Sequence, residues 1–247
     1  MATHIYKTSD NKQHNIWKII LKNTIDFFSA PFITKCKPED SNCIKENTKR
    51  VIPIFTAGIP ELGVETQDPM HIKSVNASQG NLLFVVKDAT VTGLSRCEPR
   101  NASRDVEGLK IHLTLLCTAN LVGLYTLKGS VLVLPIEGNG KILVDLKSAV
   151  INVIFDVIDK VKNDGSTHWF IKSFTYTLDF EDKSKVVFEN LYDGNEILGK
   201  AAKELVANNG NDIIKEIGRP VISHIIGEIV KNMNHMFKIA KVEDLSL

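Results

Sequence analysis

The chain has 247 residues, of which 43% are apolar and 24% are charged, and its formal net charge at pH 7 is +1. This composition is that of a globular protein. The near-zero charge, with no basic run interleaved with aromatics, excludes a nucleic-acid-binding surface. No linker rich in proline, serine or glycine divides the sequence, so we expect one domain over residues 31–247.

Residues 1–30 are expected to stand apart from that domain. A secretory signal needs an uninterrupted apolar region of about 7–15 residues, but Lys18, Lys22 and Asp26 interrupt the stretch from residue 16 to residue 30. Ser29-Ala30 would be an acceptable cleavage site. The segment is interpreted either as a degenerate signal peptide or as a wrongly assigned start, and by itself it does not establish secretion.

The first helix is predicted near residue 40. Asp40 or Ser41 can cap a helix that continues to about Ala57, where Gly58 ends it. Pro53 lies inside this helix and is expected to kink or shorten it, because proline lacks an N–H donor. The apolar side of the helix would carry Ile44, Val51, Ile52 and Phe55.

The middle of the chain is predicted to be a meander of strands. Residues 109–121 alternate apolar and polar side chains with Leu116 as the only exception, and such a strand would be about 43 Å long. Short turns join the segments, so neighbouring strands should be antiparallel. The predicted strands are residues 70–78, 81–97, 109–121, 123–134, 141–160, 168–180 and 185–190. The predicted turns are Gln79-Gly80, Glu107-Gly108, Gly138-Asn139-Gly140, Asn163-Asp164-Gly165 and Asp182-Lys183.

A second alternating strand precedes the helical C-terminal region. Its predicted apolar face carries Phe170, Phe174, Tyr176, Leu178 and Phe180. A short helix is predicted from residue 196 to residue 207, and apolar residues then recur at three- and four-residue steps from residue 212 to residue 239, which predicts a helix about 42 Å long. Charged residues interrupt this series, so it is not a membrane span.

Matched lengths of helix and strand lead to the predicted fold class. Gly218 and Pro220 lie inside the long helical stretch, so a bend is expected near Ile217. We expect an α+β protein in which a long, highly curved antiparallel sheet wraps around a long C-terminal helix.

Four cysteines suggest cross-links. Cys36 and Cys43 lie seven residues apart, where a loop enters the first helix, and so short a loop suits a local disulfide. Cys97 and Cys117 flank a hairpin with its turn near Glu107-Gly108, so they could lie opposite each other and pair. Cys117 could equally be a small buried hydrophobic residue on an apolar strand face.

Two sequons would accept glycans in a secreted protein. They are Asn76-Ala77-Ser78 and Asn101-Ala102-Ser103. Such triplets also arise by chance, so each one supports secretion only weakly.

A search for catalytic motifs predicts no catalytic residue, metal ligand or cofactor. The sequence contains no G-x-S-x-G nucleophile elbow and no phosphate-binding G-x-x-x-x-G-K-[ST] motif. His224 and His235 share a helix face but would lie about 16 Å apart, too far for one metal ion. We therefore do not expect an enzyme.

An ordered set of short motifs resembles one known family. The motifs are Cys36-x6-Cys43, Gly58-Ile59-Pro60-Glu61-Leu62-Gly63-Val64, Asp68-Pro69-Met70-His71-Ile72, Gly123-Leu124-Tyr125-Thr126-Leu127-Lys128-Gly129, Leu134-Pro135-Ile136-Glu137-Gly138-Asn139-Gly140 and Asn190-Leu191-Tyr192-Asp193-Gly194-Asn195. In order and spacing they resemble the insect takeout and haemolymph juvenile hormone-binding protein family, particularly its takeout branch, over about residues 31–240. The Cys97 and Cys117 pair is not part of that common pattern.

The resemblance implies a tubular lipid-binding fold and a secreted, non-enzymatic carrier. A small lipophilic ligand, such as a juvenile hormone, another terpenoid or a fatty-acyl compound, would occupy an apolar tunnel between sheet and helix. The resemblance also implies the Cys36–Cys43 disulfide. The alternative is an interaction or signalling protein of the same fold, related to circadian, feeding or other behaviour, that acts through its surface with a filled tunnel.

Candidate ligand contacts follow from the apolar faces. Tyr125, if it points inward, could donate the one hydrogen bond that orients an ester or epoxide, although a structural role is the alternative. We expect a monomer with no stable membrane span, and the sequence specifies no receptor. The candidate tunnel residues are Leu113, Leu115, Tyr125, Phe155, Phe174, Tyr176, Ile225, Ile229 and Met233.

Overall fold

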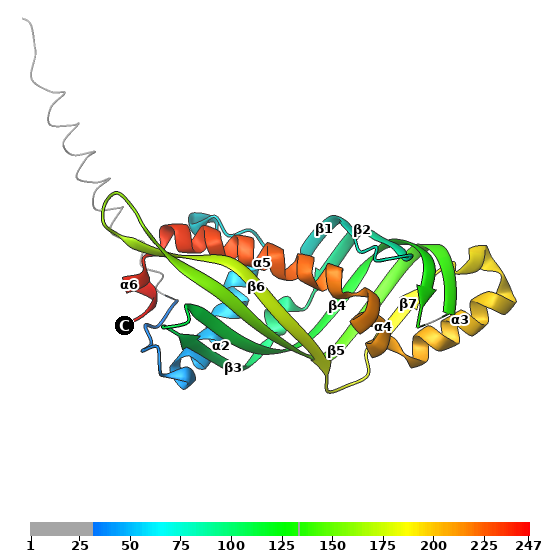
Figure 1. Ribbon diagram of the computed structural model, residues 1–247, viewed down its shortest axis with the longest axis horizontal. Helices are drawn as coiled ribbons and strands as arrows, with labels where there is room; N and C mark the ends of the chain where they lie inside the picture. The colour runs from blue at the N-terminus through cyan, green and yellow to red at the C-terminus, as the bar shows by residue number, and fades with distance from the viewer. Residues whose placement is uncertain (1–31, 133) are drawn as a thin grey trace, which may run out of the picture.

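The protein is elongated, and a long curved sheet runs along most of its length (Figure 1). The computed structural model describes residues 32–132 and 134–247, so the predicted boundary at residue 30 and the export-signal interpretation lie outside the described residues. The strands are β1 (Met70–Asn76), β2 (Leu83–Thr92), β3 (Glu98–Asp105), β4 (Lys110–Val131), β5 (Leu134–Val161), β6 (Thr167–Phe180) and β7 (Lys185–Phe188). The helices are α2 (Ser41–Ala57), α3 (Glu196–Asn208), α4 (Gly210–Ile217), α5 (Arg219–Ile239) and α6 (Val242–Leu245), with 3-10 turns η1 (Pro60–Leu62), η2 (Leu94–Arg96) and η3 (Tyr192–Gly194).

One hairpin of very long strands forms the centre of the sheet. Strands β4 and β5 pair antiparallel over the whole length of β4, from Lys110 opposite Asp156 to Val131 opposite Leu134. The outer edge of β4 pairs with β3 along one part and with β2 along the other, and β1 lies beyond β2. The outer edge of β5 pairs in the same way with β6 and then β7. The predicted antiparallel arrangement is confirmed.

Three predicted strand boundaries are wrong. The strand predicted over residues 81–97 ends at Thr92, and the turn η2 separates it from β3, which was not predicted. The segments predicted separately as 109–121 and 123–134 form the single strand β4, and Gly138-Asn139-Gly140 is not a turn but part of β5. A Cβ atom on Gly138 would lie 2.8 Å from the carbonyl oxygen of Asn190, and one on Gly140 would lie 2.8 Å from that of Glu189. These glycines therefore allow another backbone segment to pack closely onto the strand. Close approach of another backbone is a common reason for glycine inside a strand.

Bulges change which face of each long strand points inward. The register of β5 against β4 shifts by one residue near Ser148, whose φ is 42°. Buried residues of β5 have even numbers before this shift, such as Ile142, and odd numbers after it, such as Val153. A second slip lies between the pairs of Asp156 and Val157 with β6. An extra residue in one strand of a pair reverses the alternation, so both halves can face one core.

The second slip corrects one predicted face. Trp169 and Ile171 are buried, whereas Phe170 is half-buried with the Lys160 ammonium 3.4 Å from its ring centroid. Strict alternation predicted that Phe170 and Phe174 share a face. They do not, because they lie on opposite faces of β6. The bulge between them carries the chain from one parity to the other.

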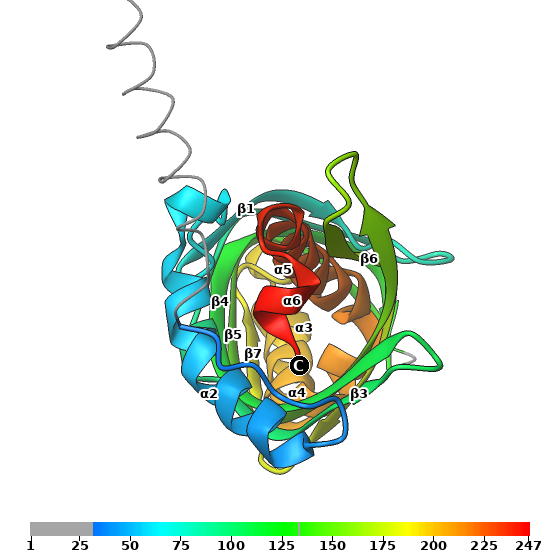
Figure 2. The same cartoon turned by 90° about the vertical axis from the view of Figure 1, so that its left-hand side faces the viewer.

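Helices close the opening that the curved sheet leaves. Helix α5 contacts β6 on one side and β1 on the other, so it fills the gap between the two edges of the sheet (Figure 2). The expected bend is confirmed, because the helical stretch breaks at Gly218 between α4 and α5. Helix α2 covers β3 and η2 and is capped by Asp40. It continues past Pro53 to Ala57, so the proline does not shorten it.

The core has two clusters along the length of the molecule. One cluster gathers around the aromatic residues Phe84, Tyr125 and Phe188, whose rings contact edge to face, and it includes residues of β1, β2, α3 and α4. The other gathers around Trp169 and Phe237, which also meet edge to face, and it includes residues of α2, α5 and β6. The space between the clusters contains the candidate site.

Candidate functional site

An apolar cavity of about 410 Å³ lies inside the curved sheet. Its walls come from β2 to β7, from the helices α2, α4 and α5, and from the segment around α6. The polar residues among the described ones that line it are Asn47, Thr48, Thr56, Ser103, Arg104, Asn120 and Ser246. The remaining wall is hydrocarbon and sulfur, so the interior suits an apolar occupant.

The helical wall is the apolar stripe that the sequence predicted. Residues of α4 and α5 at three- and four-residue steps, from Ile213 to Phe237, line the cavity, because residues at this spacing share one face of a helix. Ile225 and Ile229 are only half-buried although they face inward. The four apolar residues predicted for the first helix, Ile44, Val51, Ile52 and Phe55, also line the cavity.

The sheet wall depends on the bulges. On β4 the odd residues from Ile111 to Leu121 line the cavity, as the predicted alternation requires. On β5 the lining residues change parity at the slip near Ser148, with Ile142, Val144 and Leu146 before it and Ile151, Val153 and Phe155 after it. A straight alternating strand would turn one of these triplets toward solvent.

Six of the nine candidate tunnel residues line the cavity, and three do not. Leu113, Leu115, Phe155, Ile225, Ile229 and Met233 are on its wall. Phe174 and Tyr176 pack instead against the cluster around Trp169, and Tyr125 belongs to the cluster around Phe188. These three rings fill core beside the cavity, and their role as ligand contacts stays a prediction.

Both tyrosines use their hydroxyl groups to hold the backbone. Tyr125 Oη donates to the Glu189 carbonyl at 2.6 Å, and Tyr176 Oη donates to the Arg219 carbonyl at 2.7 Å, at the start of α5. Burial, together with the nearby carboxylates of Asp193 and Glu189, raises the pKa of Tyr125 to about 12. These contacts favour the structural role, the alternative weighed for Tyr125 above.

Arg104 is the only charged residue among the described ones that line the cavity. It lies on β3 opposite Ile111, its guanidinium carbon is 4.4 Å from the ring centroid of Trp169, and its Nη1 donates to Ser246 Oγ at 3.0 Å. Burial lowers the pKa of Arg104, with Asp159 acting in the opposite sense. An arginine remains charged at neutral pH even so, which gives this end of the cavity a fixed positive charge.

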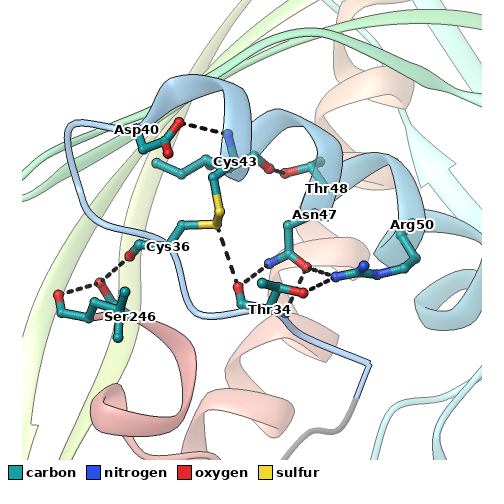
Figure 3. The surroundings of a disulfide bond; sticks show 10 residues. Thr34, Cys36, Asp40, Cys43, Asn47, Thr48, Arg50 and Ser246 are labelled. Carbon is teal, nitrogen blue, oxygen red and sulfur yellow. Dashed lines mark hydrogen bonds between the residues drawn. A yellow bond between two sulfur atoms is a disulfide. The ribbon is translucent and has the colours of Figure 1, made fainter.

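The chain segments near both termini meet at the same end. Cys36 and Ser246 form a parallel bridge in which Leu247 N donates to the Cys36 carbonyl at 3.1 Å, and Ser246 Oγ donates to the same carbonyl at 3.3 Å (Figure 3). Asn47 of α2 binds the backbone of Thr34 through both its amide nitrogen and its amide oxygen, at 3.0 Å each. These contacts lie at the end of the cavity that Arg104 lines.

Both predicted disulfides are present. Cys36 pairs with Cys43 at the start of α2. Cys97, which immediately precedes β3, pairs with Cys117 on β4. Cys36, Cys97 and Cys117 also line the cavity. The second bridge supports the predicted hairpin, since β3 and β4 pair on either side of a turn at residues 106–109.

Three further observations concern glycosylation, metal ions and membrane spans. Asn76 at the end of β1 and Asn101 on β3 are exposed, so both sequons are sterically open, and glycosylation there stays a prediction. Within residues 32–132 and 134–247, no group of three or more His, Cys, Asp or Glu side chains could hold a metal ion. None of the helices that the structure describes is long and apolar enough to span a membrane.

Comparison with known proteins agrees with this architecture. The family described as haemolymph juvenile hormone binding protein matches residues 18–247. The chain belongs to this family. The resemblance inferred from the ordered motifs is therefore confirmed.

A solved structure similar to this family member supports its fold. The crystal structure of Epiphyas postvittana Takeout 1 matches with a TM-score of 0.80 and 27% identity, and the match covers 86% of this chain and 98% of that chain. A lipopolysaccharide binding protein structure matches with a TM-score of 0.41 and 15% identity, over 77% of this chain and 38% of that one. No curated protein sequence matches the chain. The fold is the tubular lipid-binding fold of takeout proteins, with α+β composition and a curved sheet around a helix.

Proposed function

We propose that the protein is a non-enzymatic carrier that holds a small lipophilic ligand in the internal cavity. The supporting observation is the cavity itself, since its volume of about 410 Å³ falls within the range of about 300–1,000 Å³ typical of small-molecule sites. Its nearly continuous hydrocarbon wall suits a terpenoid, including ligands of the juvenile hormone class, or a fatty-acyl chain.

Apolar burial would supply most of the binding energy. Each square ångström of apolar surface removed from water contributes roughly 25 cal/mol, offset by the cost of ordering the ligand and the wall. Met233 and Met236 contribute unbranched, polarisable side chains to the wall, and such side chains adapt to ligands of different shape. Micromolar affinity for several chemically related ligands is the expected outcome.

The alternative is an interaction or signalling protein of the same fold whose tunnel is filled. The open cavity favours the carrier, because a filled tunnel would leave no such volume. Native mass spectrometry of the purified protein separates the two proposals. A carrier should bring copurified lipid as an added mass that organic extraction removes, whereas a protein with a filled tunnel should show the bare polypeptide mass before and after extraction.

Two adjacent leucines on β4 allow a matched test of where the ligand lies. Leu115 lines the cavity, whereas Leu116 is on the opposite face of the strand. Leu115→Trp should fill part of the cavity and weaken displacement of a fluorescent apolar probe by a fatty-acyl ester or terpenoid, and Leu116→Trp should leave it unchanged. Equal binding by both variants, or no displacement from the parent protein by any such compound, would contradict the carrier proposal.

The same proposal includes secretion, glycosylation and a monomeric state. The two disulfides suit an oxidising compartment, and we propose that residues 31–247 act there as one domain and as a monomer. Expression through a eukaryotic secretory pathway should give a protein whose mass falls on glycosidase treatment. Asn76→Gln and Asn101→Gln should each remove one glycan, and light scattering should report the monomer mass.

A further inference from the structure

We propose that the ligand is a long-chain carboxylic acid whose carboxylate pairs with Arg104 at the end of the cavity beside the C-terminal segment. This inference rests on the carrier function proposed above and specifies the chemical class of its ligand. Among the described residues that form the wall, Arg104 alone carries a charge. A wall otherwise made of hydrocarbon therefore has one position where an anionic head group is favoured.

The local geometry leaves the guanidinium with unused donors. Its flat face lies over Trp169, with 4.4 Å between the guanidinium carbon and the ring centroid, and one nitrogen donates to Ser246 Oγ. A guanidinium has five N–H donors. Within residues 32–132 and 134–247, no carboxylate forms an ion pair with Arg104. A partly buried charge without a counter-ion is costly, so a ligand carboxylate would relieve a deficit already built into the wall.

The charged groups around Arg104 do not replace that counter-ion. Asp159 of β5 is exposed and acts on Arg104 only through space. Asp164 accepts hydrogen bonds from Ser166 N and Ser166 Oγ, at 2.9 and 2.6 Å. Lys241 pairs with Glu243 at 3.4 Å. Each of these groups is either engaged locally or exposed to water, which leaves Arg104 available to a ligand.

Arg104 also lies where two spaces meet. A second pocket of about 750 Å³, which is open to the surface, is lined by Arg104, Asp164, Lys241 and Glu243 among others. Pro38, Arg104 and Ser246 line both this pocket and the apolar cavity. A ligand with a chain in the cavity and its head group at Arg104 would therefore place its carboxylate at the boundary between apolar wall and water.

Arginine distinguishes an acid from its ester by charge and geometry. A carboxylate can accept two parallel N–H bonds from one guanidinium, and such charge-assisted bonds are roughly twice as strong as neutral ones. A methyl ester offers a carbonyl acceptor but no charge. The apolar chain contacts are the same for both ligands, so the ratio of their affinities isolates the contribution of the head group.

The test uses matched acid and ester pairs on the delipidated full-length protein. Palmitic acid and methyl palmitate form the straight-chain pair, and farnesoic acid and methyl farnesoate form the terpenoid pair. Each compound displaces a neutral fluorescent probe from the parent protein, from Arg104→Gln and from Arg100→Gln. Arg100 is the matched control because it lies on the same strand but is exposed, in a surface ion pair with Glu181 at 3.3 Å.

The expected result is a preference for the acid of at least about tenfold in the parent protein. Arg104→Gln should reduce that preference to near one while methyl ester binding is retained, which also shows that the variant is folded, and Arg100→Gln should keep the preference. Comparison of the two pairs then shows which chain type is preferred. No preference in the parent protein, or an unchanged preference in Arg104→Gln, would overturn the head-group assignment and leave the carrier function standing. If neither acid nor ester displaces the probe, both proposals fail.

A second measurement reports the head group directly. The ¹³C chemical shift of carboxyl-labelled palmitic acid, followed against pH, gives the pKa of the bound acid. A neighbouring guanidinium favours the ionised form, so the bound acid should titrate at lower pH in the parent protein and in Arg100→Gln than in Arg104→Gln. Identical titration curves in all three proteins would place the carboxylate away from Arg104 and overturn the assignment.

Discussion

The two ends of the molecule are held together by different means. At the α3 end, which contains β7, α3 and the rings of Phe84, Tyr125 and Phe188, no disulfide occurs within the described residues, and close backbone packing holds the core. At the α2 end, which contains α2, β3 and α6, two disulfides and a bridge between Cys36 and Ser246 close the structure (Figure 1). The cavity lies between a tightly packed end and a cross-linked end.

The difference teaches how one fold can be both stable and hollow. The cavity removes contacts that a filled core would make, and residues of both clusters line it. Covalent links and a polar network add to apolar packing at the α2 end. The single charged wall residue, Arg104, is also at the α2 end, so the cavity has an apolar end and a polar end.

The largest expected effect comes from removing a cross-link at the α2 end. Replacing Cys97 and Cys117 together by serine opens a loop with a sequence separation of 20, which should cost about 3 kcal/mol of unfolding free energy. Replacing Cys36 and Cys43 together should cost less, since their separation is 7. Denaturant unfolding measures both. The reverse order would show that chain entropy does not govern these bridges.

The next effect tests close packing at the α3 end. A Cβ on Gly138 would lie 2.8 Å from both the Asn190 carbonyl oxygen and Tyr125 Oη, so Gly138→Ala should destabilise the protein by roughly 1–3 kcal/mol. Gly227 in α5 has no neighbour within 4 Å of an added Cβ, so Gly227→Ala should stabilise it by about 0.5–1 kcal/mol. Thermal unfolding of the two variants should therefore shift in opposite directions.

A smaller effect separates structure from ligand binding at the α3 end. Tyr125→Phe removes the hydrogen bond to the Glu189 carbonyl and should cost about 1 kcal/mol, with probe displacement unchanged. Loss of ligand binding without loss of stability would restore Tyr125 as a ligand contact.

The raised pKa of Tyr125 gives the same variant a pH signature. The folded-state value of about 12 exceeds the ordinary value of 10.0, so the stability from the neutral phenol is complete below pH 10 and is lost as pH rises toward 12. Unfolding free energy should fall over this interval in the parent protein more steeply than in Tyr125→Phe. Parallel curves would contradict the raised pKa.

The smallest effect is expected at acid pH, on the loop that leads into β1. Burial raises the pKa of Asp68, but hydrogen bonds from Ser95 and Gly93 outweigh it and lower the pKa overall. A lowered pKa contributes stability above the unfolded value of about 4 and loses it as pH falls through the folded value. Asp68→Asn should therefore flatten the acid limb of the stability curve and leave the alkaline limb unchanged.

Periodicity in the sequence predicted the elements that build the cavity. The stripe of isoleucines, valines and methionines in α4 and α5 became its helical wall, and the alternation around Leu113 and Leu115 became part of its sheet wall. Both predictions hold because the 3.6- and two-residue repeats are local properties of helix and strand. The helix break at Gly218 and the Cys36–Cys43 disulfide were also predicted, whereas pairing of Cys97 with Cys117 was one of two alternatives.

Contacts between distant segments decided the features that the sequence missed. The glycines at 138 and 140 resembled a turn, but they allow the backbone of residues 189–190 to pack closely against β5. The chain reverses instead near Leu132, whose φ is 48°. Likewise, inward aromatic residues such as Phe174 and Tyr176 could not be assigned to cavity or core, because the same alternation serves both.

By itself the sequence determined the long apolar helix face, the alternating strands and the Cys36–Cys43 pair, since these depend on spacing along the chain. Only the tertiary structure decided where the charge in the cavity lies. A hairpin folded symmetrically about residue 107 would place Arg104 opposite Lys110, on the polar face. One register slip between Pro99 and Asn101 pairs it with Ile111 instead and turns it inward. A shift of one residue reverses the face of every later side chain in a strand. Local sequence propensity does not predict where such a shift occurs.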